Sequence, residues 1–151
     1  MHKAGAKFNY EKALWFNHEY IRQVPETRLL PFLREYADAH GVTATDDRLT
    51  EIIRLVRDRC TLLPDLWTNS AFFFERPANW DTAEVSKKWD ADKKGFFEAL
   101  VAEFPAIEPF TETSFEEFFK ALAEKRGLKS GGLMLPLRVM LVGGKFGPPV
   151  F

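Results

Sequence analysis

Apolar residues recur three and four positions apart along most of the chain, a spacing typical of helices that bury one face. The spacing predicts a first helix over about 10–22 after Asn9 and a second over about 27–40, which Gly41 would end. A third helix is expected after Thr45. The apolar face of the first helix is expected to hold Leu14, Trp15, His18 and Ile21, and that of the third Leu49, Ile52, Ile53, Val56, Cys60 and Leu63.

The pattern changes after Pro64, where aromatic residues crowd a short segment that ends near Asn79. We expect this segment to be a loop that joins two helical subdomains around a shared aromatic plug. A helix is predicted to end at Pro105, after a capping-box-like pair at Asp81 and Glu84. The next is expected to be capped by Thr113 with Glu116, or by Ser114 with Glu117, and to end at Gly127. The aromatic segment contains Trp67, Phe72, Phe73 and Phe74.

The apolar run over 133–142 fits either a buried strand or a helix. A single strand would have nothing to pair with, so we predict a helix with Pro136 in its first turn, ended by Gly143 and Gly144. The predicted fold class is therefore all-α, with two small helical subdomains over residues 1–77 and 78–151.

Composition limits the classes of protein that this chain can belong to. Its 151 residues include a single cysteine, so no intrachain disulfide can form. No apolar run approaches the roughly 20 residues of a membrane span, and no signal peptide follows Met1, which predicts a cytoplasmic protein without a membrane partner. The net charge is −1, but residues 127–151 hold Lys129, Arg138 and Lys145 and no acid. This basic end either faces an anionic partner or arises by chance.

Catalytic and metal-binding motifs are not found in the sequence. Gly143, Gly144 and Lys145 suggest a phosphate loop, but the required glycine at 139 is Val and the required Ser or Thr at 146 is Phe. Cys60 lies on a predicted core face, where a small apolar role is more common than a nucleophilic one. We therefore expect no catalytic residue and no metal ligand in this chain.

Two arginines are candidates for recognition of a planar, polar ligand. Arg59 is expected at the edge of the third helix's apolar face, partly packed, whereas Arg54 and Arg57 are expected on its solvent side. For Arg59, pairing with a carboxylate or extension into solvent is the favoured alternative. Arg138 has no acidic residue within ten positions, so a distant partner or an outside ligand is expected to satisfy it.

Several segments, in order, resemble the bacterial glutamyl-tRNA synthetases. The first is similar to the segment just past the catalytic KMSKS loop of that family. The matching segments are KFNYEKALWFN at 7–17, YIR at 20–22, LVRDRCTL at 55–62, FFF at 72–74, and PLRVMLVG at 136–143 with Gly147 and Pro148. The resemblance implies an all-helical anticodon-binding region, often described as an α-helical cage, with tRNA(Glu) as partner and a monomeric state.

The resemblance also implies what lies elsewhere in such an enzyme. A class I catalytic domain that binds ATP, Mg and glutamate would precede Met1, and a further terminal helix would follow Phe151. The chain is then expected to be a non-catalytic piece of a glutamate–tRNA ligase, unable to aminoacylate by itself and without a cofactor of its own.

Residue roles follow from the same resemblance. Arg59 matches an arginine that contacts the first anticodon base, Arg138 matches the arginine that reads the last, and Gly147 with Pro148 matches the turn that cradles that last base. Val142 stands where threonine is frequent, and Gly147 stands where some relatives carry a hydroxyl, so backbone groups are the expected readers there. The alternative is a helical protein-interaction module that uses the aromatic patch around Trp67 and 72–74. An independent small enzyme has no supporting site.

Overall fold

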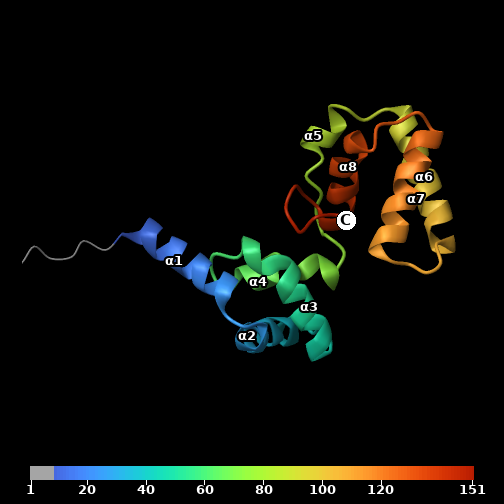
Figure 1. The fold of residues 1–151 in the computed structure, drawn as a ribbon. Coiled ribbons are helices and arrows are strands. Elements are labelled where there is room, and N and C mark those ends of the chain that lie inside the picture. Colours follow the sequence, from blue (N-terminus) through green and yellow to red (C-terminus); the bar gives the residue numbers. More distant parts are fainter. Residues whose placement is uncertain (1–8) are drawn as a thin grey trace, which may run out of the picture. The chain divides into compact units, whose positions relative to one another are not determined.

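The computed structural model describes residues 9–151, which contain α- and 3-10 helices and no strand, so the predicted all-α class is confirmed (Figure 1). The chain divides into two compact units, Met1–Glu75 and Arg76–Phe151. This division lies two residues before the boundary expected from the sequence, after Pro77. The segment 133–142 is helical, as predicted from the absence of a second strand with which it could pair.

Over residues 9–75 the first unit contains four α-helices and two 3-10 turns. They are α1 (Tyr10–Gln23), α2 (Glu26–Ala39), α3 (Asp46–Val56), η1 (Arg57–Arg59), α4 (Asp65–Thr68) and η2 (Ala71–Phe73). Asn9 and Thr45 cap α1 and α3 by accepting hydrogen bonds from the backbone N–H groups of Lys12 and Arg48. These two predicted helix starts are confirmed, and they require only residues three positions apart.

The core of the first unit forms where α2 and α3 pack together. Leu49, Ile52, Ile53, Val56 and Cys60 are buried, as the spacing predicts. The aromatic segment packs on this same core: Leu66 is buried, and Trp67, Phe73 and Phe74 lie partly buried against it. Trp67 stacks between His40 and Phe74, with centroid distances of 4.2 and 5.8 Å.

α1 joins this core only through its last turn. Ile21 is its one buried residue, whereas Trp15, which was expected on the same side of the helix, is 57% exposed. Two polar side chains hold the helix instead: Asn17 donates to the Thr61 carbonyl, and His18 Nδ1 lies 2.8 Å from the Cys60 carbonyl. The helical period of the sequence shows that one face is apolar, but it does not show how many turns of that face find a partner.

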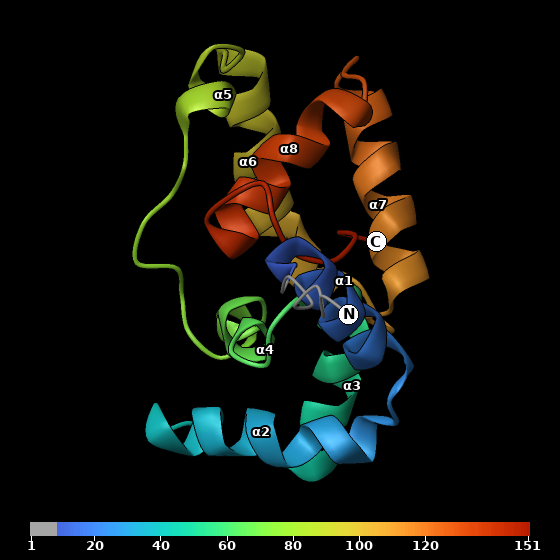
Figure 2. The same cartoon turned by 90° about the vertical axis from the view of Figure 1, so that its left-hand side faces the viewer.

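The second unit is built on three longer helices. Its elements are α5 (Ala83–Ser86), α6 (Ala91–Glu103), η3 (Phe104–Ala106), α7 (Glu112–Lys125) and α8 (Gly131–Val142). In both views α6 and α7 run side by side, and α8 packs on them (Figures 1 and 2). The rings of Phe96 in α6 and Phe119 in α7 pack edge to face, with their centroids 5.0 Å apart. The ring centroid of Phe151 lies 5.5 Å from that of Phe119.

The starts of α6 and α7 in the second unit differ from the prediction. α6 begins after Asp90, whose carboxylate accepts from the backbone N–H of Lys93 at 2.8 Å, and Asp81 instead accepts from Ala83 beside the short α5. α7 begins after Thr111, which forms a reciprocal capping box with Ser114. Serine can replace the usual glutamate in this box because its hydroxyl accepts a hydrogen bond from the Thr111 N–H. The prediction differs because it required Glu at the third position after the cap.

α8 begins two residues before the predicted start, at Gly131, which places Pro136 in its second turn rather than its first. The helix ends as predicted, because Gly143 adopts the left-handed conformation at φ 83°. This end of α8 carries the candidate site.

Candidate nucleic-acid interface

Arg138 lies on the last part of α8 and contacts the turn that follows the helix. Its Nη1 donates to the carbonyls of Gly147 and Phe146, at 3.1 and 3.4 Å. Two carbonyls of the following turn, rather than a distant partner, therefore provide part of the bonding of this arginine. An outside ligand for the rest of the guanidinium stays a prediction. Within residues 9–151 its Nε and Nη2 donate no hydrogen bond and the side chain forms no ion pair.

The turn at 146–148 owes its shape to Gly147. Gly147 is buried and has a φ of 95°, a conformation that side-chain-bearing residues rarely adopt. This conformation directs the carbonyls of Phe146 and Gly147 toward the Arg138 guanidinium. The structure thus brings together Arg138, Gly147 and Pro148, three residues that the sequence marks as candidates. Their role in reading a base stays a prediction.

The segment 77–81 covers the end of α8 on another side. The backbone N–H of Asp81 donates to the Gly143 carbonyl at 2.8 Å, and Trp80 Nε1 donates to the Met140 carbonyl at 3.3 Å. The approach is so close that a Cβ on Gly143 would lie 2.7 Å from the Asn79 carbonyl oxygen. These contacts satisfy two carbonyls at the helix end and fix Trp80 to α8.

Basic and aromatic side chains lie near this end of the helix, in a region that we call the α8-end surface. The guanidinium of Arg76 lies over the Trp80 ring, 5.3 Å from its centroid. Trp80 is 37% exposed and Phe146 is 46% exposed. The surface consists of Arg76, Trp80, Arg138, Met140, Leu141, Lys145, Phe146, Gly147 and Pro148. Positive charge close to exposed aromatic side chains is suited to unstacked nucleotides.

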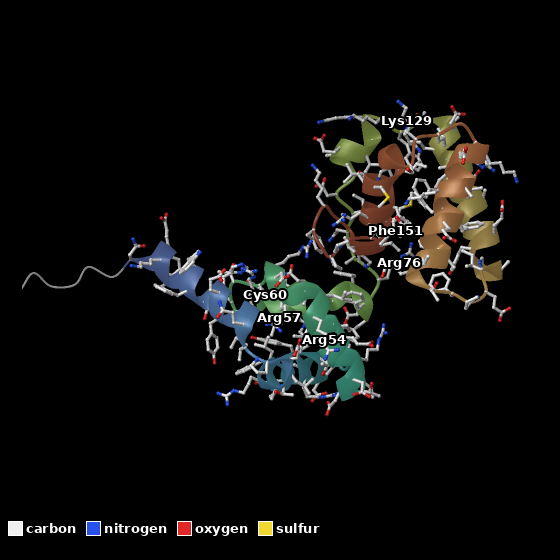
Figure 3. The ribbon with its side chains drawn as sticks, viewed as in Figure 1. Arg54, Arg57, Cys60, Arg76, Lys129 and Phe151 are labelled. Atoms are coloured by element: carbon white, nitrogen blue, oxygen red, sulfur yellow. The ribbon has the colours of Figure 1, made fainter. Side chains whose placement is uncertain are left out.

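Lys129 does not belong to this surface. It precedes the first residue of α8, and a helix of 12 residues is about 18 Å long. Lys129 and Arg76 accordingly lie toward opposite ends of the second unit (Figure 3). The basic end of the sequence therefore divides into Lys129 at one end of α8 and Arg138 with Lys145 at the other.

Arg59, the remaining candidate, lies in the first unit. It is exposed rather than partly packed, and within residues 9–151 its side chain forms no ion pair. Only its backbone is engaged, since its carbonyl accepts from the Asn69 amide at 3.3 Å. The expected position at the edge of the apolar face is wrong because α3 ends at Val56 and the tighter η1 turn changes the rotation per residue.

Arg57 is the packed arginine of this region, contrary to the expectation that it faces solvent. Its side chain is 14% exposed, donates to the Arg22 carbonyl and lies 3.2 Å from Glu26 Oε1 (Figure 3). Arg54 is exposed, as expected, and shares the same carboxylate. The backbone N–H of Glu26 itself, then Arg54 and Arg57, hold the pKa of the Glu26 carboxyl below its usual value. Both arginines thus have a structural partner.

Comparison with known proteins connects this geometry to a family. A family model described as "Anticodon binding domain" matches residues 25–151, which is most of the chain and includes the whole α8-end surface. The chain belongs to this anticodon-binding domain family.

Similar proteins extend the match to the residues before 25. Glutamate–tRNA ligases of Porphyromonas gingivalis and Bacteroides thetaiotaomicron are 35% and 33% identical to the chain, over 99% of its length and 30% of theirs. A solved glutamate tRNA ligase from Elizabethkingia meningosepticum superposes with a TM-score of 0.82 at 32% identity, over 99% of this chain and 30% of that one. A glutamate–tRNA synthetase from Elizabethkingia anophelis gives 0.78 at 34% identity, over 99% and 29%. The chain spans about 30% of the length of these relatives.

Other chemistry has little support in this anticodon-binding domain. Cys60 is buried and donates to the Val56 carbonyl, and burial raises the pKa of its thiol to about 11, which keeps the sulfur protonated near neutral pH. Across residues 9–151 no group of three or more metal-ligating side chains comes together. None of the helices described there has the length and apolar character needed to cross a bilayer.

Arg76 and Trp80 are the residues that sequence reasoning missed. The available signal was local: a tryptophan follows an arginine four positions later in a proline-containing loop. What the sequence does not show is that this loop bonds to the end of α8, 60 residues further along the chain.

Proposed function

We propose that this chain is the tRNA(Glu) anticodon-binding part of a glutamate–tRNA ligase. The family match and the similarity to glutamate–tRNA ligases over 99% of the chain support this proposal. The observation that carries it is the bracing of Arg138 by the turn carbonyls of residues 146 and 147, which orients a guanidinium whose Nε and Nη2 stay available.

In this proposal Arg138 reads the third anticodon base, and Gly147 with Pro148 forms the backbone cradle beside it. A planar guanidinium donates in parallel to two acceptors on a base edge, and anticodon loops present unstacked bases whose edges are accessible. Arg59 contacts the first anticodon base from the first unit. Its exposure and its lack of an ion pair within residues 9–151 are compatible with an external partner.

The parent ligase would join glutamate to tRNA(Glu) in the cytoplasm, using ATP and Mg in its catalytic domain. The proposal assigns no residue of this chain to ATP, Mg or catalysis, so the chain alone is expected to lack ATP–pyrophosphate exchange with glutamate. It is expected to bind tRNA as a monomer, weakly and with a shallow salt dependence, because few phosphates are contacted.

The protein-interaction alternative is less well supported by the contacts. It requires the aromatic residues around Trp67 to present a binding face, yet Trp67, Phe73 and Phe74 pack against the core of their own unit. The side chain of Trp67 is further covered by stacking with His40.

The substitution Arg138→Ala tests the proposal. A good bidentate base contact contributes about 1 to 3 kcal/mol of discrimination, or roughly fivefold to 150-fold. The wild-type chain should therefore prefer tRNA(Glu) over a variant with a changed third anticodon base, and Arg138→Ala should remove most of that preference while keeping the fold. The melting temperature of each protein is the control. Undiminished discrimination by Arg138→Ala would show that the assigned role is wrong.

A further inference from the structure

Arg76 and Trp80 have no function in the scheme above, although both lie on the α8-end surface. The Arg76 guanidinium is held over the Trp80 ring, and within residues 9–151 it forms no ion pair with Asp or Glu. Both side chains are exposed. An arginine that is oriented by an aromatic ring rather than by a carboxylate keeps its positive charge available to an anion from outside.

Trp80, over which the Arg76 guanidinium lies, is held to α8 by the contacts of its own segment. The Trp80 indole N–H bonds to the Met140 carbonyl, the neighbouring Asp81 N–H bonds to the Gly143 carbonyl, and the absence of a side chain on Gly143 permits the close approach of Asn79. Arg138 projects from the same helix end, one turn or less from Met140. Both guanidinium groups are therefore held by contacts near the same end of α8, Arg76 through Trp80 and Arg138 through the turn at 146–147. Groups that are already oriented cost less to order when a ligand binds.

We propose that Arg76, positioned by Trp80, binds a backbone phosphate of the RNA close to the nucleotide that Arg138 reads. This inference rests on the proposed function, because it takes tRNA as the ligand of the α8-end surface. The forked donors of arginine match two phosphate oxygens, and in a nucleic acid every nucleotide brings one phosphate. RNA fits better than an acidic protein because Trp80 and Phe146 are exposed, and bases stack on exposed aromatic side chains.

A salt titration of tRNA(Glu) binding separates this role from a structural one. Each phosphate contact with a single strand contributes about 0.7 to the slope of log affinity against log salt, which amounts to roughly fivefold at 0.1 M salt. Arg76→Ala in the 151-residue chain should lose about that factor in affinity and about 0.7 in slope. Lys129→Ala is the matched control, since it removes one exposed positive charge from the other end of α8 in the same unit.

Two further variants test the part played by Trp80. Trp80→Phe keeps an aromatic ring but lacks the N–H that bonds to Met140, so it should weaken binding by roughly twofold to threefold while the salt slope stays at the wild-type value. Arg76→Lys keeps the charge but not the planar fork, so it should keep the slope and lose affinity. A purely structural role would instead lower the melting temperature and leave the affinity of the folded protein unchanged.

A wild-type slope and affinity for Arg76→Ala, or an equal loss for Lys129→Ala, would overturn the inference while leaving the proposed function intact. Absence of any binding between the wild-type chain and tRNA(Glu) would instead count against the proposed function itself. If Arg76→Ala unfolds, the Arg76→Lys titration gives the answer, because an affinity equal to wild type would overturn the role of the guanidinium.

Discussion

The contact between Gly143 and the segment 77–81 makes Gly143→Ala the most informative perturbation of the second unit. Two separate costs are expected. A side chain at φ 83° is strained by about 1–2 kcal/mol, and the new Cβ would lie 2.7 Å from the Asn79 carbonyl oxygen and 2.9 Å from the Pro77 Cβ. Relieving such an overlap typically costs about 1–3 kcal/mol. The free energy of unfolding should therefore fall by roughly 2–5 kcal/mol.

Two other glycines of the same unit separate strain from overlap. Gly127 has a φ of 68° but open space around its Cβ position, so Gly127→Ala should cost only the strain, about 1–2 kcal/mol. Gly132 lies in α8 with no positive φ and open space, so Gly132→Ala should stabilise the protein by about 0.5–1 kcal/mol. From most to least stable, the order should be Gly132→Ala, wild type, Gly127→Ala and Gly143→Ala.

The appropriate assay is urea denaturation monitored by fluorine NMR of the protein with fluorine-labelled tryptophan. Trp80 and Trp89 report on the second unit, whereas Trp15 and Trp67 report on the first. The loss should appear at Trp80 and Trp89 alone. If Gly143→Ala is no less stable than Gly127→Ala, the close approach of 77–81 to α8 is wrong, and the positioning of Trp80 loses its basis.

Two predictions concern titratable groups. The thiol of Cys60, with a pKa of about 11 through burial, should resist alkylation at pH 8 in the folded chain and react at the rate of a free thiol in urea, whereas equally fast reaction in both states would contradict its burial. The hydrogen bond from the Lys93 side chain, followed by that from the Lys93 backbone, lowers the pKa of Asp90. A lowered pKa stabilises the fold above the unfolded value, near pH 4, and that stabilisation is lost as pH falls through the folded pKa. Asp90→Asn, which can still cap α6, should show a smaller acid-induced loss of stability than wild type in melts between pH 7 and 3, and an unchanged loss would refute the coupling.

Local sequence signals predicted the elements whose contacts are also local. Asn9, Thr45 and Gly143 act as helix ends through residues within one turn, and the apolar face of α3 needs only a helical period. The start of α6 at Asp90 was missed because several acidic residues precede that helix, and only the backbone conformation decides which of them caps it.

The candidate site could be predicted only in part, for the same physical reason. Arg138, Gly147 and Pro148 lie within ten residues of each other, so their motif contains most of the geometry. Trp80 joins them through a hydrogen bond that spans 60 residues, and Arg76 joins them by lying over Trp80. The surroundings of Arg59 depend on a change from α-helix to 3-10 helix. Neither a long-range bond nor a change in helical rotation leaves a periodic trace in the sequence.

The central claim is that this chain binds tRNA(Glu) through the anticodon. The direct measurement is the affinity of the wild-type 151-residue chain for tRNA(Glu), for its isolated anticodon stem–loop, and for tRNA(Glu) with all three anticodon bases replaced. The account predicts that the stem–loop binds nearly as well as the whole tRNA and that replacement of the anticodon weakens binding by tenfold or more, as expected for about 1–3 kcal/mol per base read. Equal affinity for tRNA(Glu) with and without its anticodon bases would contradict it.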